Sequence, residues 1–134
     1  MMYLKREDGA AAVEFAILLP ILIVILFGTI EFGLILYDQE VITNASREGA
    51  RYGIVIGSPR PTTSQIQNVV NTYLTNSGLH AGNATTKVTG AQGTSGSNLT
   101  VSVSFPYTYM VLPNFVAGLG SNINLGATTV MTLE

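Results

Sequence analysis

Two carboxylates stand out because of the residues around them. Glu14 immediately precedes a long apolar run, and Glu31 is the only charged residue between Phe15 and Tyr37. A charged side chain inside a bilayer costs about 2.5–3.5 kcal/mol on insertion scales, so it is retained only with a partner or a purpose. The chemistry open to these residues is therefore charge pairing in an apolar setting.

The spacing between Gly9 and Glu14 suggests one such partner. If the chain were cut after Gly9, Ala10 would carry a new α-amino group, and Glu14 would be the fifth residue of the shortened helix. The ammonium and the carboxylate would lie one turn apart on one helix face. In a bundle of identical helices, the carboxylate could instead pair with the ammonium of a neighbouring subunit and set the register.

A simpler interpretation of Glu14 also fits the spacing. A carboxylate near the start of a helix interacts favourably with the helix dipole, here at the cytoplasmic interface. The spacing alone leaves both interpretations open. For Glu31, near the far end of the apolar run, we expect contact with lipid headgroups or water, with a contact to another subunit as the alternative.

The apolar run predicts a transmembrane helix over about residues 15–37. About 20 apolar residues at about 1.5 Å each cross a hydrocarbon core of about 30 Å. A buried core helix is disfavoured because the rest of the chain is too polar to surround it. Lys5 and Arg6 precede the run and favour a cytoplasmic N-terminus with an exported C-terminal part. No small-x-small cleavage site follows the run, which argues against an ordinary secretory signal.

Composition disfavours several classes of function. The 134 residues include no cysteine, one histidine and a net charge of −2, which disfavours a metalloenzyme, a redox protein and a nucleic-acid binder. His80 is expected to be a turn residue, and no catalytic constellation emerges. We therefore expect no enzymatic activity, metal or cofactor.

The first helix is expected to continue out of the membrane to about Gly57. It carries an apolar stripe that predicts packing against a head. The stripe consists of Leu34, Tyr37, Val41, Ala45, Glu48 or Gly49, and Tyr52. Gly49 and Gly53 predict a close approach of another element. Arg47 and Arg51 lie one turn apart, with Glu48 available to neutralise one of them. We expect a solvated face there, and a docking surface for a partner carboxylate is the alternative.

The remaining residues predict a small α+β head. A capping box at Ser64–Gln67 begins a second helix, which Gly78 ends. Alternating residues predict strands over 99–105 and 123–133, with a weaker strand around Val88. A flexible loop is expected over 90–98. The predicted fold is a long N-terminal transmembrane helix continuing into a small α+β head with a second helix and a roughly three-stranded antiparallel sheet.

The N-terminal segment resembles a known family. Four residues separate Gly9 from Glu14, and the aromatic Phe15 follows at the start of the apolar helix. This pattern resembles the processing motif of type IV prepilins of the Flp/Tad class, which usually has tyrosine at the position of Phe15. The processing motif, Glu31 and the Arg47–Arg51 run follow one another in the same order as in TadE-like minor pseudopilins. The resemblance covers about the first 55 residues.

This resemblance implies a division of the chain and a set of partners. Residues 1–9 would be a leader that a prepilin peptidase removes between Gly9 and Ala10. Residues 10–57 would form the helix, and residues 58–134 would form the exported, pilin-like α+β head. Glu14 and Phe15 would serve assembly, and Glu31, Arg47 and Arg51 are candidate subunit contacts.

The implied partners are other pilin subunits through helix bundling, the prepilin peptidase, the assembly platform of the inner membrane and the lipid bilayer, with no nucleic acid. The implied location is the bacterial inner membrane, with a single span, and then the pilus or cell surface. The alternative function is an unprocessed, membrane-anchored binding module. Its ligand would lie on the loops 90–98 and 107–122.

Overall fold

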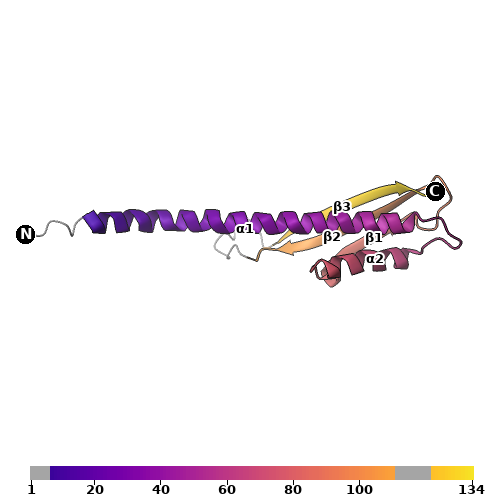
Figure 1. Cartoon of the computed structure of the whole chain (residues 1–134), viewed down its shortest axis with the longest axis horizontal. Helices are drawn as coiled ribbons and strands as arrows, with labels where there is room; N and C mark the ends of the chain where they lie inside the picture. The colour runs from indigo at the N-terminus through magenta and orange to yellow at the C-terminus, as the bar shows by residue number, and fades with distance from the viewer. Residues whose placement is uncertain (1–6, 111–121) are drawn as a thin grey trace, which may run out of the picture.

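The computed structural model describes residues 7–110 and 122–134 and shows a mixed α+β fold (Figure 1). Its elements in chain order are α1 (Glu7–Gly53), α2 (Thr63–Asn76), the short 3-10 helix η1 (Ala81–Asn83), β1 (Thr85–Thr89), β2 (Asn98–Thr108) and β3 (Asn122–Thr132). The strands form one antiparallel sheet in the order β1-β2-β3. The fold class expected from the sequence is confirmed.

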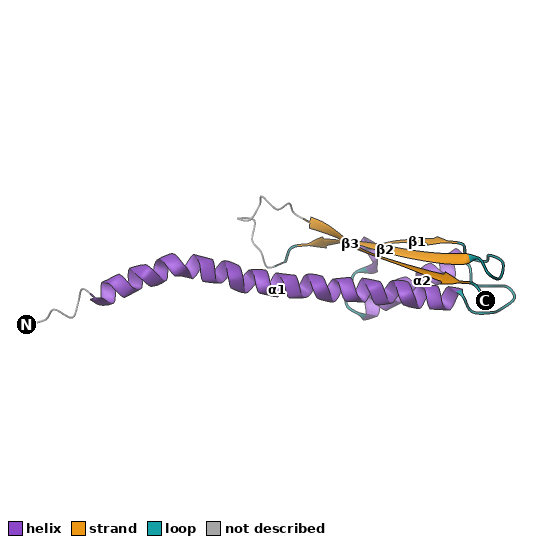
Figure 2. Cartoon of the chain, turned by 90° about the horizontal axis from the view of Figure 1, so that it is seen from above, coloured by secondary structure: helices purple, strands orange, loops and turns teal. Residues whose placement is uncertain are grey.

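Helix α1 has two halves with different surroundings. Its N-terminal half projects away from the rest of the chain, whereas its C-terminal half packs against the sheet and α2 (Figure 2). The projecting half is curved and contains Pro20, whose missing N–H removes one helix hydrogen bond. The helix ends at Gly53 rather than near Gly57.

One face of the sheet is covered by the helices, and the other face is exposed to solvent. In β2 the buried side chains alternate with exposed or half-buried ones from Leu99 to Tyr107. In β3 the odd-numbered residues from Ile123 to Met131 are likewise the more buried ones. This alternation is expected for an antiparallel sheet with a single buried face, and the expected pattern over these strands is confirmed.

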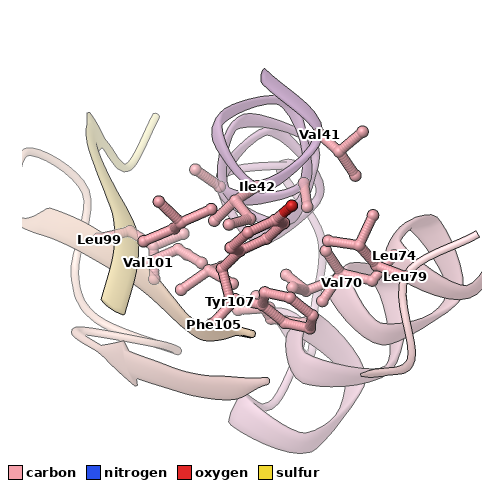
Figure 3. Close-up of a cluster of buried hydrophobic side chains, with 14 of the residues drawn as sticks. Val41, Ile42, Val70, Leu74, Leu79, Leu99, Val101, Phe105 and Tyr107 are labelled. Carbon is pink, nitrogen blue, oxygen red and sulfur yellow. The ribbon is translucent and has the colours of Figure 1, made fainter. Parts of the chain in front are cut away.

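The core of the head lies between this covered face, α1 and α2. Figure 3 shows Ile42 from α1 above Val101 from β2, with Val70 and Leu74 of α2 on the other side. Glycine permits the close approach of the two helices. A Cβ atom on Gly49 would lie 2.5 Å from Cγ2 of Val70, and one on Gly53 would clash with Leu99 and Ile66. The close packing predicted at these glycines is confirmed.

The buried face of α1 differs in part from the predicted stripe. Val41, Ala45 and Gly49 are buried as expected, but Tyr37 is 55% exposed and Tyr52 is 38% exposed. The prediction omitted the buried Ile42 and Ser46, and it placed Ala50 and Gly53, which are also buried, outside the stripe although it expected a close approach there. The predicted stripe is too narrow because α1 packs simultaneously against α2, β2 and β3 and so buries a wider arc.

The start of α2 also differs from the prediction. The N-cap residue is Thr62, whose hydroxyl accepts from the backbone N–H of Gln65, while the Gln65 side chain accepts from the Thr62 N–H. The capping box predicted at Ser64–Gln67 is therefore wrong by two residues, since Thr62–Gln65 offers the same pattern one half-turn earlier.

The end of α2 follows the prediction. Gly78 has a positive φ of 86°, and its N–H donates to Thr75 while that of Leu79 donates to Leu74. This pair of bonds is the Schellman arrangement, which satisfies two carbonyls at the helix end. Leu79 is buried, so the turn also directs the chain back onto the core.

Each edge strand of the sheet receives a glutamine side chain from a helix. Nε2 of Gln39 in α1 donates to the carbonyl oxygen of Gly126 in β3 at 3.0 Å. Nε2 of Gln67 in α2 donates to the carbonyl oxygen of Thr86 in β1 at 3.0 Å. These bonds fix each helix to the outer strand that it accompanies.

Candidate functional site

The projecting half of α1 is an apolar surface that no other described residue covers. Apolar side chains from Val13 to Ile30 are mostly between 37% and 66% exposed. The most apolar window of this helix is 0% buried, with a mean hydropathy of 2.7. This is the one helix in the described ranges that is long and apolar enough to cross a membrane. Such a surface requires lipid or other apolar helices around it.

The expected cutting site, the bond between Gly9 and Ala10, lies within the described part of this helix, which starts at Glu7. Glycine is a poor helix former. A Cβ on Gly9 would meet nothing within 4 Å.

Glu14 and Phe15 lie about one turn beyond this bond, in the projecting half of α1. Both are exposed, and the Phe15 side chain is 59% exposed. No hydrogen bond or ion pair within the described residues involves Glu14. Its carboxylate is therefore open to a group from outside the chain or to a new α-amino group at Ala10.

Glu31 lies in a buried polar contact between α1 and the head. It is 1% exposed, and it accepts hydrogen bonds from the hydroxyl of Tyr107 and, at 3.0 Å, from the backbone N–H of Met110. Figure 3 shows the Tyr107 hydroxyl turned toward α1. The expectation that Glu31 reaches headgroups or water is therefore wrong, because the end of β2 encloses it. This burial also leaves it little surface for a contact with another subunit.

Tyr107 is suited to this donor role. Burial raises the pKa of its hydroxyl above the ordinary value, and the hydrogen bond to Glu31 raises it further. The hydroxyl therefore stays protonated at neutral pH and donates to the carboxylate. Charge-assisted hydrogen bonds of this kind are stronger than neutral ones, so Glu31 and Tyr107 join the head to α1 at the point where the apolar helix begins to project.

The head therefore starts nearer the N-terminus than expected. Leu34 and Ile35 pack against the core, and the Tyr37 hydroxyl donates to the carbonyl oxygen of Ser77. The head thus covers part of the last two turns of the expected span. The uncovered apolar helix comprises residues 9–30, and about 20 residues still suffice to cross a bilayer core.

The two arginines beyond Glu31 lie on the exposed side of α1. Arg51 forms an ion pair of 3.0 Å with Glu48, as expected from their spacing. Arg47 is exposed and forms no ion pair within the described residues. The structure does not bring either arginine near Glu31, which faces the head.

Sequence reasoning missed Tyr107 and Met110 as partners of Glu31. Tyr107 continues the inward-facing series of β2 by one further step after Phe105, and this was the available signal. No sequence pattern indicated the backbone N–H of Met110.

The loops considered for a ligand provide no assembled site in the described residues. The connection over 90–98 is held by hydrogen bonds, including Gly96 N–H to Leu133 and Leu133 N–H to Ser97. The expected flexible loop is thus an ordered turn, with glycines 90 and 96 at positive φ. Most of the second loop, residues 111–121, lies outside the described residues. His80 occupies the N-cap position of η1 without a side-chain capping bond and is exposed, as expected for a turn residue.

The arrangement defines a class of protein: one long apolar helix, uncovered over its first half, that carries an α+β head on its second half. The family model for TadE-like proteins matches residues 9–51. Over these residues the chain is similar to TadE-like proteins, which are associated with the Flp/Tad pilus system. Searches of curated proteins and of solved structures returned no significant match.

The match covers the whole uncovered helix and most of the part that packs in the head. TadE-like pilus proteins are structural, and the family suggests a role related to minor pilins and interaction with other pilus components. The apolar helix suggests membrane anchoring, which fits a pilus-associated membrane protein.

Proposed function

We propose that this chain is a minor pilin or pseudopilin subunit of a Flp/Tad-type pilus and that a prepilin peptidase cuts it between Gly9 and Ala10. The observation that carries the proposal is the division of α1: residues 9–30 are uncovered, while the rest is fixed in the head. A subunit that moves from bilayer to fibre needs such a helix, because lipid and neighbouring helices can cover it in turn.

Cutting would supply the partner that Glu14 lacks. The new ammonium of Ala10 and the Glu14 carboxylate are opposite charges in a low-dielectric region, where an unpaired charge is strongly unfavourable. A neighbouring subunit can enter the bundle with its ammonium against this carboxylate. The pairing would select the axial position at which subunits join.

The head would remain on the exported side, and the assembly platform of the inner membrane would supply the energy. The contact of Glu31 with Tyr107 would hold the head in a fixed direction relative to the helix while the subunit moves. The partners under this proposal are the peptidase, the platform, the other subunits and the lipid.

Intact-mass analysis and N-terminal sequencing of the protein from a strain that makes Flp/Tad pili test this proposal. The mature chain is expected to begin at Ala10. Recovery of only the uncut chain, beginning at Met1 or Met2, would contradict processing and indicate an unprocessed membrane-anchored protein.

Two variants separate cutting from assembly. Gly9→Ala is expected to reduce cutting, whereas Glu14→Ala is expected to be cut but to enter sheared pili several-fold less than the wild type. Glu7→Ala is the matched control, because it removes a carboxylate that leaves with the leader. Normal incorporation of Glu14→Ala would show that the pairing role is wrong.

A further inference from the structure

One side of α1 along the head carries charges of both signs in a regular order. Glu40, Asn44, Arg47 and Arg51 are spaced by four, three and four residues, which places them on one helix face. Ile42 and Gly49 come two residues after Glu40 and Arg47, about half a turn around the helix, and both are buried. The charged face is thus turned away from the head.

This face is open and its charges are incompletely paired. Glu40, Arg47 and Arg51 are exposed, and Asn44 is half-buried. Glu40 accepts a hydrogen bond of 2.9 Å from Nδ2 of Asn44, and Arg51 pairs with Glu48. Arg47 has no hydrogen bond or ion pair within the described residues. Figure 1 shows α1 in front of the sheet, with its near side uncovered along the head.

The acid and the base are separated along the helix by a fixed interval. Seven residues, or about two turns, lie between Glu40 and Arg47, which corresponds to a rise of about 10.5 Å. The same interval separates Asn44 from Arg51. A parallel copy of α1 displaced by this interval would therefore place an arginine beside an acceptor at both positions.

We propose that this face binds a second copy of the chain, parallel to the first and shifted by about two helical turns, with Arg47 of one copy against Glu40 of the next. The proposal rests on the proposed function, because copies anchored in one membrane by the same helix have parallel α1 helices. Charge complementarity along the face identifies the occupant, since an unshifted copy would place each arginine opposite an identical arginine.

This contact differs from a symmetric dimer. The basic end of the face on one copy meets the acidic end on the other, so the two copies contribute different ends of the same face. An exposed ion pair contributes little stability by itself. Its role here is to select the axial offset among helices that the membrane already holds close together.

Disulfide trapping tests the offset directly, because the chain contains no cysteine. Two full-length variants, one with Asn44→Cys and one with Arg51→Cys, carry different affinity tags and are produced together in a piliating strain. These positions have the proposed offset and leave Glu40 and Arg47 intact. The mixed pair is expected to yield at least threefold more cross-linked dimer than either same-site pair.

Charge exchange then tests the pairing itself. Glu40→Arg or Arg47→Glu, placed in both copies, is expected to reduce the mixed cross-link at least twofold. The double variant Glu40→Arg/Arg47→Glu is expected to restore it, which would also show that the single variants are folded. Equal cross-linking for mixed and same-site pairs, or no response to charge exchange, would overturn the proposal.

The N-terminus of the same samples separates this proposal from the proposed function. Chains that begin at Ala10 and enter pili but do not cross-link in this register would overturn only the contact. Chains that remain uncut would contradict the proposed processing, whatever their cross-linking.

Discussion

The Glu31 carboxylate accepts a hydrogen bond from the hydroxyl of Tyr107, 76 residues later in the chain. The first residue lies where α1 begins to project from the head, and the second lies near the end of β2. One buried contact therefore joins the N-terminal helix to the middle strand of the sheet. It determines where the head begins along the helix.

Tyr107→Phe removes this hydrogen bond while keeping the ring. We expect the free energy of unfolding of the head to fall by about 1–3 kcal/mol, since a bond to a buried charged group is lost. Denaturation of the full chain in detergent micelles, followed by circular dichroism, measures the change. Tyr52→Phe is the control, because the exposed Tyr52 hydroxyl makes no hydrogen bond within the described residues. Equal stabilities for the two variants would rule out the contribution of the contact.

The same hydroxyl predicts a loss of stability in alkali. The pKa of Tyr107 is raised in the folded state, so the folded chain retains this proton more strongly than the unfolded chain. The stabilising effect of the protonated Tyr107 hydroxyl is therefore complete below about pH 10, the ordinary pKa of tyrosine, and declines as the pH rises further. Thermal melts from pH 8 to 11 should show a smaller decline for Tyr107→Phe than for the wild type. Parallel declines would contradict the raised pKa.

Gly49→Ala tests the close packing of α1 and α2. The added Cβ would lie 2.5 Å from Cγ2 of Val70, and overpacking of this kind costs about 1–3 kcal/mol. A lowered melting temperature of the full chain is the expected result. Gly33→Ala is the matched control, since its Cβ would meet nothing within 4 Å. Adding Val70→Ala to Gly49→Ala should recover part of the loss only if the clash is its cause.

Thr62→Ala removes the N-cap of α2. The hydroxyl accepts from the N–H of Gln65, and loss of such a cap costs about 0.5–2 kcal/mol. Ser64→Ala is the comparison, since Ser64 lies inside the helix and provides no cap. Thermal denaturation should therefore separate the two variants, and a larger effect at Ser64 would place the start of α2 where the sequence pattern predicted it.

Local patterns predicted most of the fold. The charge-free run before Glu31 predicted the long helix, and alternation in β2 and β3 predicted the strands and their buried faces. Gly78 predicted the end of α2, because a helix often ends at a glycine with positive φ. These features depend on the residues within one element, so the sequence contains their signal.

The features that were missed depend on contacts between elements. Glu31 lies about four turns before Ala45 on the same face of α1, but the predicted stripe begins at Leu34 and therefore leaves out the buried Glu31. The wide buried arc of α1 follows from its packing against two layers at once. The Glu14 side chain forms no hydrogen bond or ion pair within the described residues, and a Cβ on Gly9 would meet nothing within 4 Å, so the roles proposed for them would depend on other molecules.

The glutamine bonds at Gly126 and Thr86 have a consequence for crowded membranes. An outer strand with free backbone groups is a template on which sheets of different molecules can merge into aggregates. A helix side chain already occupies one carbonyl on each outer strand, which interrupts that template. This arrangement therefore disfavours the merging of sheets between heads that are held at high local density.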